Sequence, residues 1–343
     1  MLFIKERKTK KDTRKYYSLK NMEIEEYPHT WTISQTQKFN IQKEVTEIPI
    51  NLFVIPSNCE TFCYIIISYS FGFNIYKSNQ TESPLVPITQ YSYGKPIIFS
   101  FIIRSTYSYT FELWFIFKNE DNSLRMSFVS FDPFKDNLIT DSGALSKYVI
   151  KQNDIITQVE QKDNILALVS FNRLIVIRGH EQIANKLFKN EITAMTNNGR
   201  SVFIGFINGD LVEYSILSES LTEVSQHHAP ITSITYTIDS IYVGTLDGKL
   251  HIHPLVQRVI SRKKAVIELD GSAIYTVYSN HLAKFPLIVL CRKGIHVITT
   301  QSNEVVFTPI SPPNNTNVLT MGVNLEVGVI ALLCDNEMTL YSI

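Results

Sequence analysis

Short apolar stretches alternate with turn residues along most of this chain, and many are followed by a run in which apolar and polar positions alternate. Residues 201–206 are mostly apolar, and after Ile207, Asn208 and Gly209 the chain continues Asp-Leu-Val-Glu-Tyr. Short apolar runs are typical of strands buried on both faces, whereas alternation is typical of strands buried on one face. The pattern predicts β-hairpins throughout, with a short helix only at residues 181–189.

The hairpin pattern repeats at a fixed spacing. Residues 192–214 and 231–253 carry the same succession of apolar, polar and turn residues, thirty-nine positions apart. Asn208-Gly209 and Asp247-Gly248 occupy corresponding places, and both dipeptides favour the positive φ angles of a two-residue hairpin. A repeat of about 40–45 residues with this content predicts one four-stranded blade of a β-propeller.

The same frame extends to both sides of these two units. Three further hairpins are predicted, one before the two repeats at residues 165–177 and two after them at residues 287–298 and 329–341. In the first of them Asn172 takes the place of Gly209. Two more units are predicted in the N-terminal half, at residues 48–93 and 95–131, the second with a turn at Asp121-Asn122.

The fold class that follows is all-β, a seven-bladed β-propeller, with six or eight blades left open. Seven blades of about 42–45 residues need about 300 residues, which fits a chain of 343. The last unit ends after three strands, so residues 31–39 are predicted to supply its fourth strand and close the ring. Residues 1–28 are predicted to form a basic, flexible extension and residues 29–343 a single propeller domain.

The unit around residues 226–254 resembles the WD-repeat family. His227 stands where that family has its loop histidine, Thr245 where it has a strand hydroxyl, and Asp247 where it has a turn aspartate. His253 replaces the family's tryptophan. The resemblance implies a network of hydrogen bonds from His227 to Thr245 and Asp247 that braces the blade. Without tryptophan-aspartate pairs, the repeats look most like the degenerate propellers of trafficking proteins, such as the lethal-giant-larvae and tomosyn family.

Charge is balanced over the whole chain but not locally. The formal net charge is +0, so the molecule has no general field that would attract nucleic acid, and a nucleic-acid partner is not expected. Two basic clusters are candidates for anionic surfaces. The first could contact an anionic membrane and contains Lys5, Arg7, Lys8, Lys10 and Lys11. The second is a possible anionic-ligand patch and contains Arg258, Arg262, Lys263 and Lys264.

Catalytic and metal-binding motifs are not recognisable in the sequence. The four cysteines have neither the spacing of a disulfide framework nor that of a paired-ligand zinc site, and Cys291 and Cys334 are expected to be small core residues. No nucleophile elbow, phosphate-binding glycine loop or helical histidine pair occurs. The sequence therefore predicts no catalytic residues, metal or cofactor.

These observations predict a non-enzymatic scaffold for protein–protein interaction, located in the cytoplasm because no signal sequence or bilayer-length apolar run occurs. A subunit or adaptor in membrane trafficking is the narrower expectation. A propeller that binds lipid headgroups through its basic residues is the alternative, and a cryptic propeller hydrolase is the third interpretation.

Overall fold

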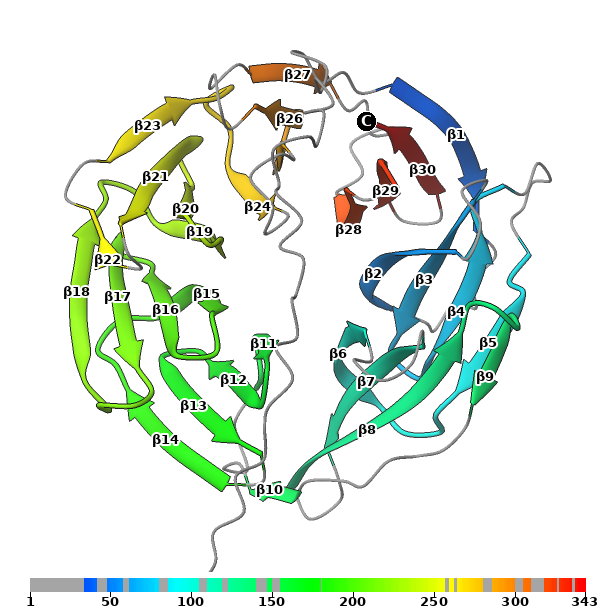
Figure 1. The fold of residues 1–343 in the computed structure, drawn as a ribbon, viewed down its shortest axis with the longest axis horizontal. Coiled ribbons are helices and arrows are strands. Elements are labelled where there is room, and N and C mark those ends of the chain that lie inside the picture. Colours follow the sequence, from blue (N-terminus) through cyan, green and yellow to red (C-terminus); the bar gives the residue numbers. More distant parts are fainter. Residues whose placement is uncertain are drawn as a thin grey trace, which may run out of the picture.

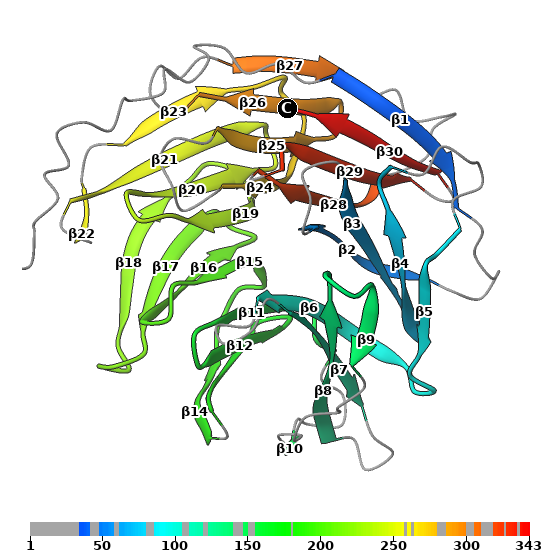
Figure 2. The same ribbon diagram turned by 45° about the vertical axis from the view of Figure 1, so that its right-hand side comes forward.

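The computed structural model arranges the chain as seven antiparallel sheets around a central axis (Figure 1). It describes residues 34–41, 48–57, 62–79, 86–104, 110–118, 123–139, 147–149, 155–179, 181–256, 259–261, 264–279, 286–299, 305–309, 318–325, 327–334 and 337–343. This ring is the predicted seven-bladed β-propeller, and Figure 2 shows the same ring turned by 45°.

The blades are numbered in chain order. Blade 1 contains β2 (Pro49–Pro56), β3 (Cys63–Tyr69), β4 (Gly72–Lys77) and β5 (Thr89–Ser92). Blade 2 contains β6 (Ile97–Arg104), β7 (Phe111–Lys118), β8 (Ser123–Asp132), β9 (Asn137–Ile139) and β10 (Lys147–Val149). Blade 3 contains β11 (Gln158–Lys162), β12 (Ile165–Ser170), β13 (Arg173–Arg178) and β14 (Glu181–Leu187). Blade 4 contains β15 (Ile192–Asn197), β16 (Ser201–Phe206), β17 (Asp210–Ser215) and β18 (Leu221–Gln226).

The remaining three blades complete the ring. Blade 5 contains β19 (Ile231–Tyr236), β20 (Ser240–Thr245), β21 (Lys249–Val256), β22 (Val259–Ile260) and β23 (Ala265–Glu268). Blade 6 contains β24 (Ile274–Tyr278), β25 (Leu287–Cys291), β26 (Gly294–Ile298) and β27 (Val305–Pro309). Blade 7 contains β28 (Val318–Asn324), β29 (Val329–Cys334), β30 (Glu337–Ser342) and β1 (Ser34–Asn40).

The hydrophobic core lies between neighbouring blades. β12 and β16 are buried at every position, which is why their sequences read as apolar runs without alternation. Val176 of blade 3 and Val202 of blade 4 belong to one buried cluster, and Ile66 of blade 1 packs in another with Phe115 of blade 2. Each blade therefore depends on its neighbours for the burial of its faces.

The predicted ring closure is confirmed. β1 pairs antiparallel with β30, the last strand of the chain, so strands from the two ends of the sequence share one sheet (Figure 1). Ile41, just after β1, is 5% exposed and packs in one cluster with Met338 and Leu340. Lys38 and Glu337 form an ion pair of 2.6 Å across the two strands. Residues 31–33 of the predicted closing strand lie outside the described residues.

Polar side chains link successive inner strands around the axis, each donating to a backbone carbonyl of the next blade. Gln158 Nε2 donates to Thr193 O at 2.7 Å, Thr193 Oγ1 to Ile231 O at 2.5 Å, and Thr235 Oγ1 to Val277 O. Further round the ring come Tyr278 to Met321 O (2.7 Å), Asn324 to Val54 O (3.2 Å) and Asn51 to Ser100 O (2.6 Å). These bonds fix one blade against the next at the axis.

The turns differ from the predicted two-residue type. In blades 4 and 5 the positive φ falls on Gly209 (87°) and Gly248 (80°), and not on the preceding Asn208 and Asp247. Gly209 N donates to Phe206 O at 3.0 Å and Gly248 N to Thr245 O at 3.1 Å, so each loop is a three-residue turn that ends in a left-handed glycine. In blade 3 the positive φ falls on Phe171 (51°) rather than on Asn172. The turn at Asp121-Asn122 lies outside the described residues.

The helix predicted at residues 181–189 is wrong, because residues 181–187 form β14, the outer strand of blade 3. Val176 pairs with Ala184 across the two strands, and Ala184 is 6% exposed. Pairing with β13 and burial of one face override the weak helical propensity of the segment. Among the described residues, the structure has no helix with the length and apolar character needed to cross a membrane.

Gly244 provides a test of the packing between blades. A Cβ atom at this position would lie 2.6 Å from Ile274 Cγ2, on the first residue of the next inner strand. Gly244→Ala is therefore expected to lower the free energy of unfolding by about 1–3 kcal/mol through overpacking, measured by urea denaturation. Ile274→Ala removes the opposing atom, so the double variant should lose less stability than the sum of the single variants. Strict additivity would contradict this account of the contact.

Candidate functional site

Exposed apolar side chains occupy the tips of the turns that join the second and third strands of four blades. They are Phe71 (42% exposed), Phe171 (47%), Ile207 (47%) and Leu246 (51%). Because every blade repeats the same strand order around one axis, these turns lie on one face of the ring, called the turn face below. Apolar residues that recur at equivalent exposed positions are characteristic of a surface that binds a partner.

Backbone hydrogen bonds hold these turns in place. Ile207 N donates to Glu191 O at 3.1 Å, and Leu246 N donates to Pro230 O at 2.9 Å, so each tip is joined to the segment that leads into its own inner strand. Phe171 O accepts from Ile192 N of the following blade at 2.9 Å. The apolar tips are thus presented by fixed backbone, which lowers the ordering cost of binding.

The segments that lead into the inner strands add apolar surface to the same face. Ile48 is 69% exposed, and its carbonyl accepts a hydrogen bond of 3.0 Å from Ser70 N beside the Phe71 tip. Ile155, just before β11, is 60% exposed, and Leu187, which pairs with Arg173 beside the Phe171 tip, is 72% exposed. In the described part of the chain, the exposed apolar residues of the turn face include Ile48, Phe71, Ile155, Phe171, Leu187, Ile207 and Leu246.

A cavity of about 1050 Å³ is lined by the inner strands of blades 3 to 6. Its wall is mostly polar, with Gln158, Thr193 and Thr232 among the lining residues, and the exposed side chains of Ile238 and Tyr275 line it as well. Groups that bond one blade to the next thus also line this cavity. A mixed wall of this kind suits the binding of a polar peptide segment better than that of a small apolar ligand.

Two titratable groups of this cavity are shifted toward their neutral forms. Burial raises the pKa of Glu160 to about 7, and nearby Lys162 opposes the shift. Burial, with a smaller contribution from Glu160, raises the pKa of Tyr278 to about 12, and its hydroxyl donates to Met321 O. Tyr278 is therefore a structural hydrogen-bond donor, and Glu160 is a carboxyl group of the cavity wall whose neutral form is favoured by burial.

The residues of the expected bracing network are close together in blade 5, but their hydrogen bonds differ from the expectation. Thr245 Oγ1 donates to Asp247 Oδ1 at 2.6 Å and contacts Lys249 O at 2.9 Å. The ring of His227 instead forms its hydrogen bond with Ser225 Oγ, at 2.9 Å through Nε2, and its buried Nδ1 has no hydrogen-bond partner.

Three imidazole rings pack together in blade 5. The ring centroid of His227 lies 4.3 Å from that of His251 and 5.5 Å from that of His253, in edge-on arrangements. Burial lowers the pKa of His227 to about 3 and that of His253 to about 4, and the imidazole of His251 adds to both shifts. The pKa of His251 is lowered as well, again chiefly by burial. The cluster is therefore neutral at physiological pH and fills the place that the WD-repeat resemblance gives to a tryptophan.

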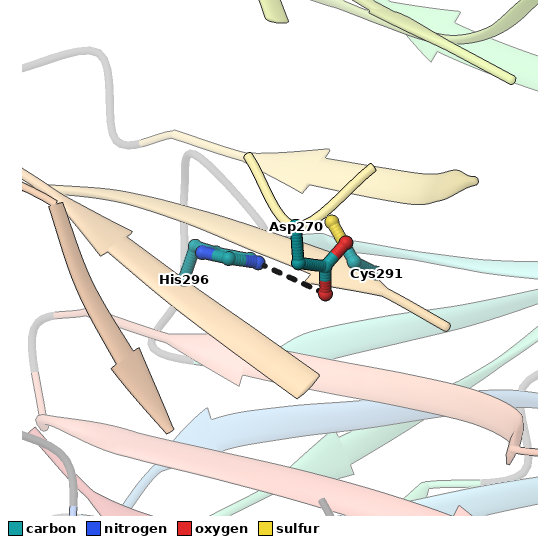
Figure 3. A group of neighbouring side chains, drawn as sticks. All are labelled: Asp270, Cys291 and His296. Carbon is teal, nitrogen blue, oxygen red and sulfur yellow. Dashed lines mark ion pairs between the residues drawn. The ribbon is translucent and has the colours of Figure 1, made fainter. Parts of the chain in front are cut away.

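A second polar cluster lies in blade 6, formed by Asp270, Cys291 and His296 (Figure 3). One ligand atom from each lies within 4.8 Å of the other two, and His296 Nε2 is 3.4 Å from Asp270 Oδ2. Asp270 Oδ1 accepts from Ser272 N at 2.8 Å and from Ser272 Oγ. Cys291 is 0% exposed, and its pKa is raised to about 12 by burial and by Asp270, so the thiol is neutral and shielded.

The basic clusters fall almost wholly outside the described residues. Of the second cluster, Lys264 is described and lies exposed just before β23, whereas Arg258, Arg262 and Lys263 are outside. Lys5, Arg7, Lys8, Lys10 and Lys11 are outside as well. Both clusters stay predictions.

Comparison with known proteins agrees with the architecture. No family model matches the chain. No curated protein matches it either. Among solved structures, a chain of the mitotic checkpoint complex matches with a TM-score of 0.61 at 9% identity, covering 92% of this chain and 94% of that one. The computationally designed protein Ika8 matches with a TM-score of 0.58 at 11% identity, covering 90% of this chain and 100% of that one. The chain is a β-propeller. At these identities the likeness shows the fold alone, and WD-repeat membership stays a prediction.

Sequence reasoning missed both the turn face and the blade 6 cluster. The apolar tips could have been found, because Ile207 and Leu246 occupy the same place in two repeats thirty-nine residues apart, and Phe171 lies in the corresponding turn of a third hairpin. The cluster was hidden because Asp270 lies twenty-one residues before Cys291 in a different part of the blade, and strand register alone brings them together.

Proposed function

We propose that this chain is a non-enzymatic scaffold that binds protein partners across its turn face. The observation that carries the proposal is the recurrence of an exposed apolar side chain at the same turn in blades 1, 3, 4 and 5. If these turns served only to connect strands and faced solvent alone, polar residues would be favoured at their tips. The partner is expected to present an apolar segment flanked by polar groups.

The fold supports this proposal, since propellers commonly present loop-bearing faces to other proteins. One structural neighbour is a chain of a multi-protein assembly, the mitotic checkpoint complex. The resemblance to degenerate trafficking propellers narrows the proposal, and it predicts that subunits of vesicle coats or tethers are among the partners. The lipid-binding alternative depends on basic residues that lie almost wholly outside the described part of the chain.

The hydrolase interpretation has little support from the described residues. The cluster that comes nearest to a nucleophile, base and carboxylate is that of Cys291, His296 and Asp270. Its cysteine is fully buried and its thiol is neutral, so a substrate has no access to it and the reactive thiolate is disfavoured.

Replacing two turn tips tests the scaffold proposal. The variant Ile207→Ser/Leu246→Ser is expected to reduce capture of the partner from native extract at least about tenfold, since buried apolar anchors each contribute about 1–2 kcal/mol to binding. Both side chains are about half exposed, so the melting temperature should change little. Quantitative pull-down with protein identification provides the measurement.

Leu217→Ser is the matched control. Leu217 is 90% exposed in the turn between the third and fourth strands of blade 4, on the opposite face of the ring. It should leave capture unchanged. Equal loss in both variants, or full capture by the double variant, would contradict a role for the turn face. Flotation with anionic liposomes that disappears when residues 1–28 are removed would favour the lipid-binding alternative instead.

A further inference from the structure

We propose that Asp270, Cys291 and His296 bind a divalent transition-metal ion, with Zn²⁺ as the ion whose coordination they fit best. The site lies inside blade 6, where the loop before β24, the end of β25 and the middle of β26 meet (Figure 3). None of the three residues lines the cavity beside the axis.

The strand register shows that the fold does not require polar groups at this place. In blade 6, Ile274 pairs with Cys291 and Val289 with His296, and Asp270 is four residues before Ile274. The equivalent positions of blade 4 hold Phe188, Phe206 and Val212, and the two phenylalanine rings lie 5.2 Å apart. Apolar side chains can therefore occupy these three positions without any change in the strand pairing of the blade.

Blade 6 instead buries polar atoms there without hydrogen-bond partners. His296 is 3% exposed, and its Nδ1 has no hydrogen-bond partner. Its Nε2 and Asp270 Oδ2 form no hydrogen bond and have only each other, as an ion pair of 3.4 Å. The ring of His296 packs on Phe307 at 4.7 Å between centroids, which shields it further. Leaving buried polar atoms without partners is costly, so a ligand that uses these lone pairs would explain why they are present.

The donor atoms match a tetrahedral zinc ion. Zn²⁺ binds cysteine sulfur, histidine nitrogen and carboxylate oxygen, and bonds of about 2.1 Å place two light-atom ligands about 3.4 Å apart in a tetrahedron. His296 Nε2 and Asp270 Oδ2 are 3.4 Å apart. Cys291 Sγ lies within 4.8 Å of one ligand atom from each of the other two residues, so it can supply the third ligand once the side chains draw together around the ion. Binding releases the thiol proton, and water or another donor takes the fourth position.

A second-sphere contact already orients the carboxylate. Ser272 donates both its backbone N–H and its hydroxyl to Asp270 Oδ1, which leaves Oδ2 directed at His296. Carboxylate ligands of metal sites are commonly held in this way by hydrogen bonds to the second oxygen.

Cobalt titration of the full chain tests the proposal. After dialysis against chelator, one equivalent of Co²⁺ should produce the thiolate charge-transfer absorption and the intense visible bands of a four-coordinate site, and Zn²⁺ should displace it. Cys291→Ser should abolish the charge-transfer band. Asp270→Asn preserves the shape of the side chain and can keep the hydrogen bonds from Ser272, and it should weaken Co²⁺ binding tenfold or more. This second variant tests the site even if Cys291→Ser does not fold.

Cys334→Ser is the matched control, because Cys334 occupies the corresponding register position in blade 7, opposite Val318. It should leave the cobalt spectrum unchanged. A titration with no cobalt–thiolate absorption at one equivalent, or a spectrum that survives Cys291→Ser and is lost in Cys334→Ser, would overturn the proposed site.

Discussion

Lowering the pH from about 7.5 to about 5 is expected to remove about 3 kcal/mol of the stability that the buried histidines of blade 5 contribute, and protonation of Glu160 in the folded chain, whose pKa burial raises to about 7, offsets part of this loss. His227 and His253 are 4% and 2% exposed, and burial lowers their pKa values from the ordinary 6.5 to about 3 and about 4. They stay neutral in the folded chain at pH 5, whereas the same groups in the unfolded chain are protonated. The measurement is urea denaturation across this pH range.

The sign follows from which state binds more protons. Between the unfolded pKa of 6.5 and the folded values, the unfolded chain holds about one more proton per histidine, so stability is full above pH 6.5 and declines as the pH falls. Each such proton contributes about 1.4 kcal/mol per pH unit, which gives at most about 4 kcal/mol for two histidines over about 1.5 units, and partial solvation lowers this to about 3 kcal/mol. Asp247 lies nearby and opposes the shift of His227, while Lys264 adds to it.

Blades 4 and 7 suggest a variant that tests whether the histidine cluster causes this pH dependence. Tyr214 and Tyr341 occupy the register position of His253 in blades 4 and 7, so His253→Tyr should be accommodated and should make the pH dependence shallower by about one proton. His228→Gln, at an exposed neighbour, should leave it unchanged. An identical pH dependence in the wild type and His253→Tyr would rule out the cluster as the source.

The fold could be predicted because its signals are local. Apolar runs such as residues 202–206 and the turn glycines Gly209 and Gly248 specify strands and hairpins within a few residues of sequence, and the spacing of the hairpins specifies blades. The incomplete last unit indicated that an N-terminal strand had to close the ring, as β1 does. The error at residues 181–187 arose because an outer strand with one buried position carries little periodicity of its own.

The sites were less predictable because they depend on register and on contacts between blades. A shift of strand register by one residue would change which carbonyl Thr193 reaches and whether His227 faces Thr245 or Ser225. The hydrophobic pattern of the sequence does not encode contacts at this level of detail. The same holds for Cys291, which reads as an ordinary core residue until the pairing of β24 with β25 places it beside Asp270. Local sequence patterns thus specify the blades, whereas the polar contacts within and between blades depend on how the strands pair in three dimensions.

Removing residues 1–41 is expected to cause the other large loss of stability, because it deletes the strand that closes the ring. Ile41 is 5% exposed in the cluster that contains Met338 and Leu340, and loss of a buried side chain of this size alone costs about 2–5 kcal/mol. β30 would also become an unpaired edge strand with apolar residues uncovered, which promotes association between chains. Thermal unfolding and light scattering should show a lower melting temperature and the formation of aggregates.

A shorter deletion separates ring closure from the basic extension. Removing residues 1–28 takes away the basic cluster and keeps β1, so the melting temperature should equal that of the full chain if the extension and the propeller are distinct units. A synthetic peptide of residues 31–43 added to the chain that lacks residues 1–41 should restore much of the lost stability by pairing with β30, whereas a scrambled peptide should not. If removal of residues 1–41 left the melting temperature unchanged, closure by β1 would contribute nothing to stability, and the contacts between neighbouring blades would hold the ring by themselves.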